Sequence, residues 1–258
     1  MIRSHRSVLL VLAILLTACG TNGPPRILLF SKTEGYRHES IPAAHAMFRQ
    51  LAKNNGFTVD STEDASVFTP DVLDGYEAVV FLLTTQDVLD DAQQASFEAY
   101  VREGGGYVGI HSASDTEYDW PWYGKLVGGY FDGHPNNPNV RQGTVWVEDP
   151  YHVSTNHLPA RWVRDDEWYD IRDLNADVNI LLTVDESTYL DTVRTEFHPL
   201  SWYHPFDGGR AFYTALGHTT ESYSEEPFVQ HVLGGLQYAL GRGDRIPGPP
   251  PEDSFRKE

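Results

Sequence analysis

The sequence predicts an α/β domain built on a doubly wound, mostly parallel sheet, with additional strands and loops in its C-terminal half. Short apolar runs of strand length alternate with segments in which apolar residues recur at helical spacing. The run at 77–83 has the apolar density typical of a strand covered on both faces, and the run at 107–110 is closed in by glycines. Parallel strands joined by right-handed helical crossovers are therefore the expected assembly.

The expected strands fall into two groups. The parallel strands are predicted near residues 26–30, 57–62, 77–83, 106–110 and 211–216. Two later segments have strand-like patterns and should extend or cover the sheet, near residues 140–148 and 179–184.

Helices are predicted between these strands. In the first helix Pro42 suits the first turn, and Gly56 is placed to end it. The other helices are predicted near residues 70–74, 90–103 and 227–240. The stretch at 120–135 is rich in glycine and aromatic residues, and it is predicted as loops packed on the sheet.

A dense polar group follows the predicted strand at 106–110. In an open parallel sheet the ligand crevice lies outside the carboxyl ends of the strands, and a sharp strand-to-helix turn there exposes one side chain. We expect His111 to be that exposed side chain and to be catalytic, with Ser112 and Asp115 beside it as substrate-binding residues. An ordinary strand end with a half-satisfied histidine is the alternative.

Polar residues also follow other predicted strands. His38, the segment 84–86 and His218 each come after a strand of the parallel group. Because the carboxyl ends of parallel strands meet at one edge of a sheet, these residues and His111 predict a shared cleft. A histidine can act as acid, base or ligand near neutral pH, so we expect His218 to be catalytic and His38 to contact substrate.

One carboxylate and several tryptophans complete the candidates from residue type alone. Glu167 is a general acid/base candidate, for which a helix cap or a solvated charge is the alternative. Trp168 and Trp202 could stack on sugar rings, and aromatic core is their alternative. No cofactor is firmly implied. A divalent metal is compatible with the histidines, although the His-Glu-x-x-His spacing of zinc helices does not occur.

The N-terminus predicts export and lipid attachment. Arg3 and Arg6 precede an apolar run of nine residues at 8–16, which is too short to span a bilayer as a helix of about 20 residues. Leu16-Thr17-Ala18-Cys19 follows and resembles the lipobox of bacterial lipoproteins, in which the cysteine is lipidated. A signal peptide followed by a chance cysteine is the alternative.

These features give the expected organisation of the chain. Residues 1–18 are the lipoprotein signal peptide, 19–25 the lipidated tether, 26–242 the α/β domain and 243–258 a Pro-rich tail. Cys19 is the only cysteine, so no internal disulfide and no thiol nucleophile are expected in the domain. Gly20 after the cysteine favours the outer membrane if the host is Gram-negative.

The charge balance narrows the partners. The chain has 37 acidic and 19 basic residues and a net charge of −18 at pH 7. Such an acidic surface argues against nucleic acid and against docking on anionic lipid. Membrane attachment should therefore come from acyl chains at Cys19, on the periplasmic side or at the cell surface. The expected partner is a small carbohydrate substrate, and the sequence does not identify a protein partner.

An ordered series of short motifs resembles the ThuA-like (trehalose utilisation) domain from about Arg26 to Leu240. The motifs are Gly109-Ile-His-Ser-Ala113, Gly128-Gly-Tyr-Phe131 with His134-Pro135, Asp166-Glu-Trp-Tyr169, Pro199-Leu-Ser-Trp202 with His204, and Gly209 to His218. We expect His134 and His204, which lie in these motifs, to bind substrate. The resemblance implies the flavodoxin-like fold of class I glutamine amidotransferases and a role in disaccharide or keto-sugar catabolism.

Three functions remain open at this point. The first is an enzyme that acts on a disaccharide or keto-glycoside, with His111, Glu167 and His218 as proton donors or acceptors. The others are a non-catalytic sugar-binding lipoprotein and a scaffold for a protein partner. Amidotransferases have a catalytic cysteine where this chain has His111, so glutamine hydrolysis through a Cys-His-Glu triad is excluded.

Overall fold

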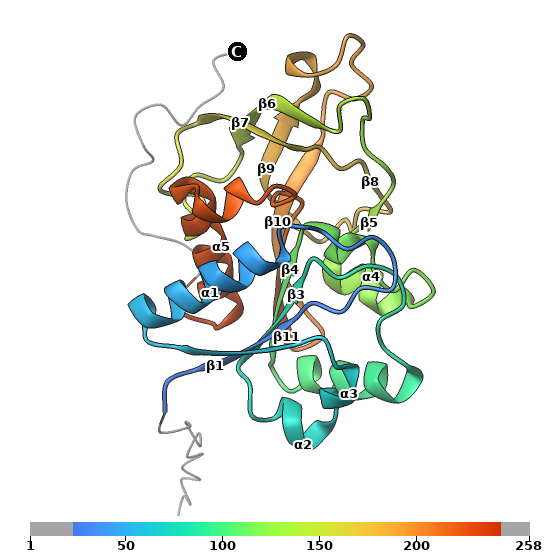
Figure 1. The fold of residues 1–258 in the computed structure, drawn as a ribbon, viewed down its shortest axis with the longest axis vertical. Coiled ribbons are helices and arrows are strands. Elements are labelled where there is room, and N and C mark those ends of the chain that lie inside the picture. The colour runs from blue at the N-terminus through green and yellow to red at the C-terminus, as the bar shows by residue number, and fades with distance from the viewer. Residues whose placement is uncertain (1–22, 244–258) are drawn as a thin grey trace, which may run out of the picture.

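The computed structural model describes residues 23–243, in which nine strands form one sheet flanked by helices (Figure 1). The predicted signal peptide, Cys19 and residues 244–258 of the predicted tail lie outside the described residues. The strand order is β2-β1-β3-β4-β11-β10-β9-β6-β7. Among the described residues, no helix is both long and apolar enough to cross a membrane.

The first five strands in this order are parallel, as the sequence predicts. They are β2 (Thr58–Thr62), β1 (Arg26–Phe30), β3 (Ala78–Leu82), β4 (Gly106–Ile110) and β11 (Gly209–Thr214). In β1, β3 and β4 every residue except Arg26 is buried. This confirms that the sheet is covered on both faces.

The other four strands continue the sheet in antiparallel pairs. They are β10 (Pro199–Phe206), β9 (Asn179–Asp185), β6 (Val140–Val147) and β7 (Arg161–Glu167). The predicted later strands therefore extend the sheet, and β7 and β10 are strands that were not predicted. A separate two-stranded ribbon is formed by β5 (Tyr130–Phe131) and β8 (Ile171–Arg172).

The helices lie on both sides of the parallel strands. α1 (Ile41–Asn55) and α5 (Glu226–Ala239) lie on one side, and α3 (Asp91–Arg102) and α4 (Pro121–Val127) lie on the other (Figure 1). α4 forms within the stretch that was predicted as loop. The short helices are α2 (Pro70–Leu73), η1 (Ala65–Val67), η2 (His111–Asp115), η3 (Glu186–Thr188) and η4 (Glu221–Ser224).

Adjacent residues of β4 show how the two faces are packed. Tyr107 belongs to an aromatic cluster on the face of α3 and α4. Its neighbour Gly106 faces α5, where an added Cβ would lie 2.5 Å from the carbonyl oxygen of Ala239. Successive residues of a strand point to opposite faces, so β4 requires no side chain at Gly106 and a large one at Tyr107. This packing fixes β4, and with it the residues that follow at its carboxyl end.

Candidate functional site

Three histidines and one glutamate meet at the carboxyl edge of the parallel strands. His38 follows β1, His111 begins η2 directly after β4, and His218 follows β11. Glu167 is the last residue of β7, at the far edge of the sheet order. One ligand atom from each residue can be chosen so that all four lie within 4.8 Å of one another. The structure thus brings together the three predicted catalytic residues and His38.

His111 lies at a strained point of the backbone and is held by one strong contact. Its φ of 52° lies in the left-handed region, which costs a non-glycine residue roughly 1–3 kcal/mol and is often found at functional sites. Its Nδ1 lies 2.6 Å from the carbonyl oxygen of Ala215 and donates to it. The Nε2 atom then faces the cluster, 3.3 Å from Nδ1 of His218 and 3.4 Å from a carboxylate oxygen of Glu167.

The sharp turn is present, but His111 is not exposed as we expected. Its exposed fraction is 0%, because the ring of Tyr169 packs against it with centroids 4.1 Å apart. Tyr169 comes from the segment after β7, far away in sequence. The cavity beside the turn is lined instead by His38, Glu167 and His218.

Glu167 is a buried carboxylate surrounded by hydrogen-bond donors. One oxygen lies 3.0 Å from Nδ1 of His218, and the other accepts from the amide of Asn139 at 2.7 Å. Burial by itself would raise the pKa of Glu167, but the hydrogen bonds with His111 and His218 outweigh it and hold this pKa well below its usual range. Glu167 is therefore ionised at neutral pH.

The histidines around Glu167 respond differently to the site. Burial, reinforced by the neighbouring His111 and His218, lowers the pKa of His38 to about 2, so His38 is neutral. Burial also acts to lower the pKa of His218, but its hydrogen bond with Glu167 prevails and raises that pKa. The site thus contains one neutral imidazole, one carboxylate and one imidazole that favours its proton.

A buried ion pair anchors Glu167 to the strand end that carries His218. Asp166 accepts hydrogen bonds from the backbone N–H groups of Gly217 at 2.9 Å and His218 at 3.1 Å. Arg164 lies 3.0 Å from the same carboxylate and is itself buried. Charged residues of β7 therefore connect this strand to the segment that follows β11. Asp166 was not selected from the sequence, although its position in the Asp-Glu-Trp-Tyr motif was the available signal.

Three members of the cluster, His38, Glu167 and His218, line a cavity of about 290 Å³. Of the residues selected from the sequence, the cavity is lined by His38, Asp115, His134, Glu167 and His218. Four further lining residues were not selected from the sequence, and these are Tyr36, Phe131, Asn139 and Tyr169. Three of these are aromatic: Phe131 and Tyr169 lie within the motifs that were noted, and Tyr36 lies two residues before His38.

Asp115 and Ser112 occupy different depths at the same turn. Asp115 faces the cavity and accepts hydrogen bonds from Tyr118 at 2.6 Å and Gln86 at 3.2 Å. Burial raises the pKa of Asp115 despite these bonds. Ser112 is fully buried, and its hydroxyl lies 3.5 Å from Nδ1 of His38. Ser112 therefore contacts His38 but does not line the cavity.

Three residues expected to bind substrate are buried and do not line this cavity. Trp202 and Trp168 are both 0% exposed, and their indole N–H groups donate to backbone carbonyl oxygens. His204 is also buried and pairs with Ala211 at the amino end of β11, away from His218. A sugar cannot stack on a ring that no solvent reaches. The structure thus corrects the expectation of substrate contact for these three residues and favours the aromatic-core alternative for the tryptophans.

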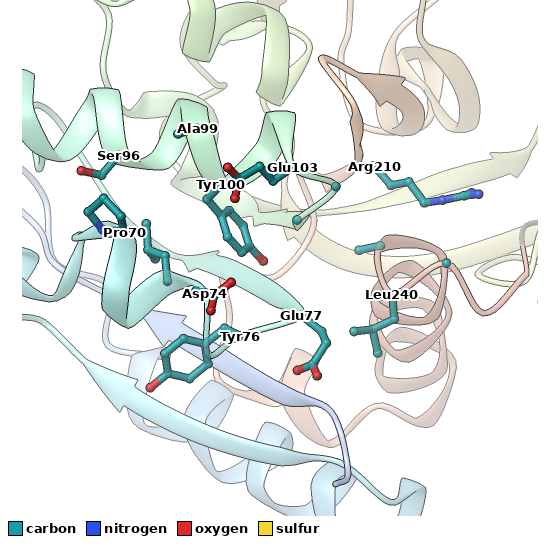
Figure 2. A pocket seen from close by; sticks show the side chains of 15 residues that line it. Pro70, Asp74, Tyr76, Glu77, Ser96, Ala99, Tyr100, Glu103, Arg210 and Leu240 are labelled. Atoms are coloured by element: carbon teal, nitrogen blue, oxygen red, sulfur yellow. The ribbon is translucent and has the colours of Figure 1, made fainter. Parts of the chain in front are cut away.

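A second cavity opens at the opposite edge of the sheet and has a volume of about 360 Å³ (Figure 2). It lies at the amino ends of β3, β4 and β11, where Glu77, Gly105 and Arg210 line it. Figure 2 shows the carboxylates of Asp74 and Glu103 spaced around this opening. Within residues 23–243, the groups that could hold a metal ion lie elsewhere. The smaller cavity at the carboxyl edge is therefore the candidate site.

A second charged cluster supports one wall of the site. His198 lies 2.9 Å from a carboxylate oxygen of Glu186, and its other nitrogen donates to the carbonyl oxygen of Tyr169 at 2.8 Å. Arg194 makes two hydrogen bonds of 2.6 Å with Asp170. Since these groups satisfy one another, the cluster serves to hold Tyr169 over His111.

Comparison with solved structures shows the fold. A ThuA-like protein from Bacteroides uniformis ATCC 8492 matches with a TM-score of 0.70 and 24% identity, over 86% of this chain and 94% of that chain. A ThuA-like protein from Parabacteroides merdae ATCC 43184 matches with a TM-score of 0.66 and 22% identity, over 89% and 94%. A protein from Thermoplasma acidophilum described as a GMP synthase subunit matches with a TM-score of 0.50 and 12% identity, over 86% and 99%. The α/β fold is thus shared with ThuA-like and amidotransferase-like structures.

Comparison with curated proteins gives no match. Residues 26–239 match the model of a protein family described as "ThuA: Trehalose utilisation". This span holds all five parallel strands and every residue of the His/Glu cluster. The chain therefore belongs to the ThuA (trehalose utilisation) family, which gives it a carbohydrate-related role.

Proposed function

We propose that the protein is an enzyme that acts on a disaccharide or keto-glycoside, and that the His/Glu cluster holds a divalent metal ion at its reaction centre. The observation that carries the proposal is the convergence of His38, His111, Glu167 and His218, whose ligand atoms lie within 4.8 Å of one another. Three imidazoles and one carboxylate are a common donor set for Zn²⁺ and related ions. The aromatic wall of the cavity suits a sugar ring.

The protonation states of Glu167 and His38 also favour a metal ion. Ligands must be deprotonated, and Glu167 is ionised while His38 is neutral. Nδ1 of His111 is engaged by the carbonyl oxygen of Ala215, so Nε2 is the atom that faces the cluster and would bind the metal ion, as in metal-binding histidines. A carboxylate with such a low pKa is a weak proton acceptor, so Glu167 is better suited to bind a cation than to act as a base.

The chemistry follows from the substrate class. A bound divalent ion would act as a Lewis acid toward a sugar oxygen. In a keto-glycoside, the keto group acidifies the hydrogen on the neighbouring carbon. Asp115 lines the cavity outside the four ligands, and burial raises its pKa toward the range useful for accepting this proton. His134, which also lines the cavity, is placed to donate a proton to the departing glycosidic oxygen.

A second candidate role for the same residues is direct acid–base catalysis without a metal. The observation that favours it is the contact of 3.0 Å between Nδ1 of His218 and the Glu167 carboxylate, which raises the pKa of His218. In this role His218 is the proton donor and Glu167 stabilises its charge. The reaction would then proceed at the same cavity and on the same class of substrate.

Metal analysis followed by substrate incubation tests the function. We expect the purified protein to contain about one equivalent of a transition metal, and to convert 3-ketotrehalose faster than unmodified trehalose. A chelator should abolish this conversion, and the added metal should restore it. A metal-free protein with full turnover would support the acid–base role instead. Binding of both sugars without conversion would contradict the enzyme and support a sugar-binding protein.

We further propose that the protein is exported and anchored by lipid at Cys19, with the domain on the periplasmic side or at the cell surface. The signal-like residues 1–18 and the lipobox support this proposal. Replacing Cys19 by Ala should release the protein from the membrane fraction or leave it unprocessed. Detergent phase partitioning of both proteins measures this change. Unaltered fractionation of the variant would contradict lipid attachment.

A further inference from the structure

Tyr36 is an exposed aromatic residue at the border of the candidate site. Among the exposed large hydrophobic residues in the described part of the chain, it has the largest exposed fraction, 62%. Single exposed apolar side chains are ordinary on protein surfaces. Tyr36 differs because it lines the same cavity as His38, Glu167 and His218.

The backbone that carries Tyr36 is tied to the loop after β3. Thr33 forms a bridge with Thr85, and the N–H of Glu34 donates to the Thr85 carbonyl oxygen at 3.0 Å. The Thr85 hydroxyl accepts from the N–H of Gly35 and donates to the Tyr36 carbonyl oxygen, both at 3.1 Å. These contacts therefore hold the backbone that carries the exposed ring in place.

Gly35 makes this close approach feasible. A Cβ added at Gly35 would lie 2.7 Å from Cγ of Gln86 and 3.3 Å from the Thr85 hydroxyl. A larger residue would force the Gln86 side chain to move. The sequence thus places a glycine where the Tyr36 segment must pack tightly, so that the ring is held in place before a ligand arrives.

The ring of Tyr36 connects the cluster with the outside of the cavity. It meets the ring of His38 edge to face, with centroids 4.8 Å apart and an angle of 86°. His38 is buried, whereas most of Tyr36 is exposed. Tyr36 therefore contacts the proposed reaction centre through His38, and most of its surface is open to solvent.

The volume of the cavity limits what it can enclose. At about 290 Å³ it lies at the lower end of the range of roughly 300–1,000 Å³ for small-molecule sites. A cavity of this size would enclose one ring of a two-ring substrate, and the other ring would pass Tyr36, which lines the cavity and is 62% exposed. We propose that Tyr36 is the stacking surface for the second ring of a two-ring substrate, an inference that rests on the proposed function.

The test compares ligands with one and two rings. Binding of 3-ketotrehalose, trehalose, 3-ketoglucose and glucose is measured by calorimetry for the wild type, Tyr36→Ala and Tyr36→Phe. Tyr36→Ala should weaken the two-ring ligands by about tenfold, which corresponds to about 1.4 kcal/mol, and leave the one-ring ligands unchanged. Tyr36→Phe should bind as the wild type does, because it keeps the ring.

Phe197→Ala is the matched control. Phe197 is also an exposed aromatic residue, with an exposed fraction of 52%, but it does not line the cavity. This variant should bind all four sugars normally. An equal loss of one-ring and two-ring binding in Tyr36→Ala, or no loss, would overturn the inference.

The proposed function can fail separately. If the wild type binds 3-ketotrehalose without converting it, the enzyme is contradicted, and the ratio of two-ring to one-ring affinities still supports or overturns the role of Tyr36. If the wild type binds none of the four sugars, both proposals are overturned.

Discussion

Replacing Glu167 by Gln should reduce turnover of a keto-disaccharide by about 10²- to 10⁴-fold, the scale expected for one essential acid–base or charge-stabilising group. Gln keeps the shape of the side chain and removes its charge. The carboxylate lies within 3.4 Å of His111 and 3.0 Å of His218, and it accepts from Asn139. No other carboxylate belongs to this cluster within the described residues, so its charge would not be replaced.

Glu221→Gln is the matched control for this variant. Glu221 is exposed in η4, three residues after His218, so the same change of charge is made near the site without altering the cluster. Turnover of this control should equal that of the wild type. Full activity of Glu167→Gln on a substrate that the wild type converts would show that the reaction centre lies elsewhere.

The metal content of Glu167→Gln separates the two candidate roles of the cluster. If Glu167 is a ligand, the variant should retain much less metal than the wild type under the same dialysis. If Glu167 only stabilises the charge of His218, metal content should not differ between the two proteins. The loss of turnover is expected in both cases, so for this variant the metal content and not the turnover tells them apart.

The pH dependence of the metal-free protein gives an independent check on the same contact. The pKa of His218 is raised because its hydrogen bond with Glu167 outweighs burial. Stability from this contact is present below the unfolded pKa of histidine, about 6.5, and is lost as pH rises through the folded pKa. In Glu167→Gln the His218 pKa should fall, as NMR titration of the imidazole would measure. An unchanged His218 titration would contradict the contact.

The parallel half of the fold was predictable because its patterns are local. The run Ala-Val-Val-Phe-Leu of β3 is buried at every position, and such a run reads as a two-sided strand without any tertiary information. The carboxyl ends of such strands share one edge, which is why His38, His111 and His218 could be grouped from the sequence. To group these histidines, it was enough to know the direction of the strands, and no side-chain contact had to be known.

The strand that carries Glu167 could not be recognised in the same way. β7 alternates between exposed and buried positions, but two of its buried residues are Arg164 and Asp166. They pair with each other at 3.0 Å, so a charged pair occupies positions where an apolar pattern would have revealed the strand. Where Glu167 lies depends on the antiparallel register of β6 and β7, which the sequence does not display.

The burial of His111 and Trp202 could not be predicted from the sequence for a related reason. The turn after β4 has the expected geometry, yet Tyr169 covers the histidine from a segment whose path is set by β7. Trp202 was predicted to face sugar because β10 was not recognised as an interior strand. In the structure β10 lies between β11 and β9, so its side chains alternate between two packed faces.

Trp202→Ala should destabilise the protein by about 3–5 kcal/mol, the usual cost of truncating a large aromatic side chain in a core. Its indole packs on Tyr213 with centroids 4.6 Å apart and donates to the Val127 carbonyl oxygen at 2.8 Å. A Cβ at Gly128 would overlap the indole nitrogen, so the chain has no side chain where this ring must fit. Denaturant unfolding followed by circular dichroism measures the loss. Trp202→Phe should lose less, because it keeps an aromatic ring and gives up the hydrogen bond.

The same substitution should reach the site indirectly. Tyr213 donates to the His111 carbonyl oxygen and forms a hydrogen bond with the Ser114 hydroxyl, both at 2.8 Å. These two bonds stabilise the strained turn. Without Trp202, Tyr213 loses its packing partner, and turnover should fall together with stability. Trp122→Ala is the control, since this half-buried indole lies on α4 and bonds Asp207 at 2.8 Å, outside the cavity lining. A Trp202→Ala protein with wild-type stability and selectively weakened sugar binding would return Trp202 to the cleft and contradict its place in the core.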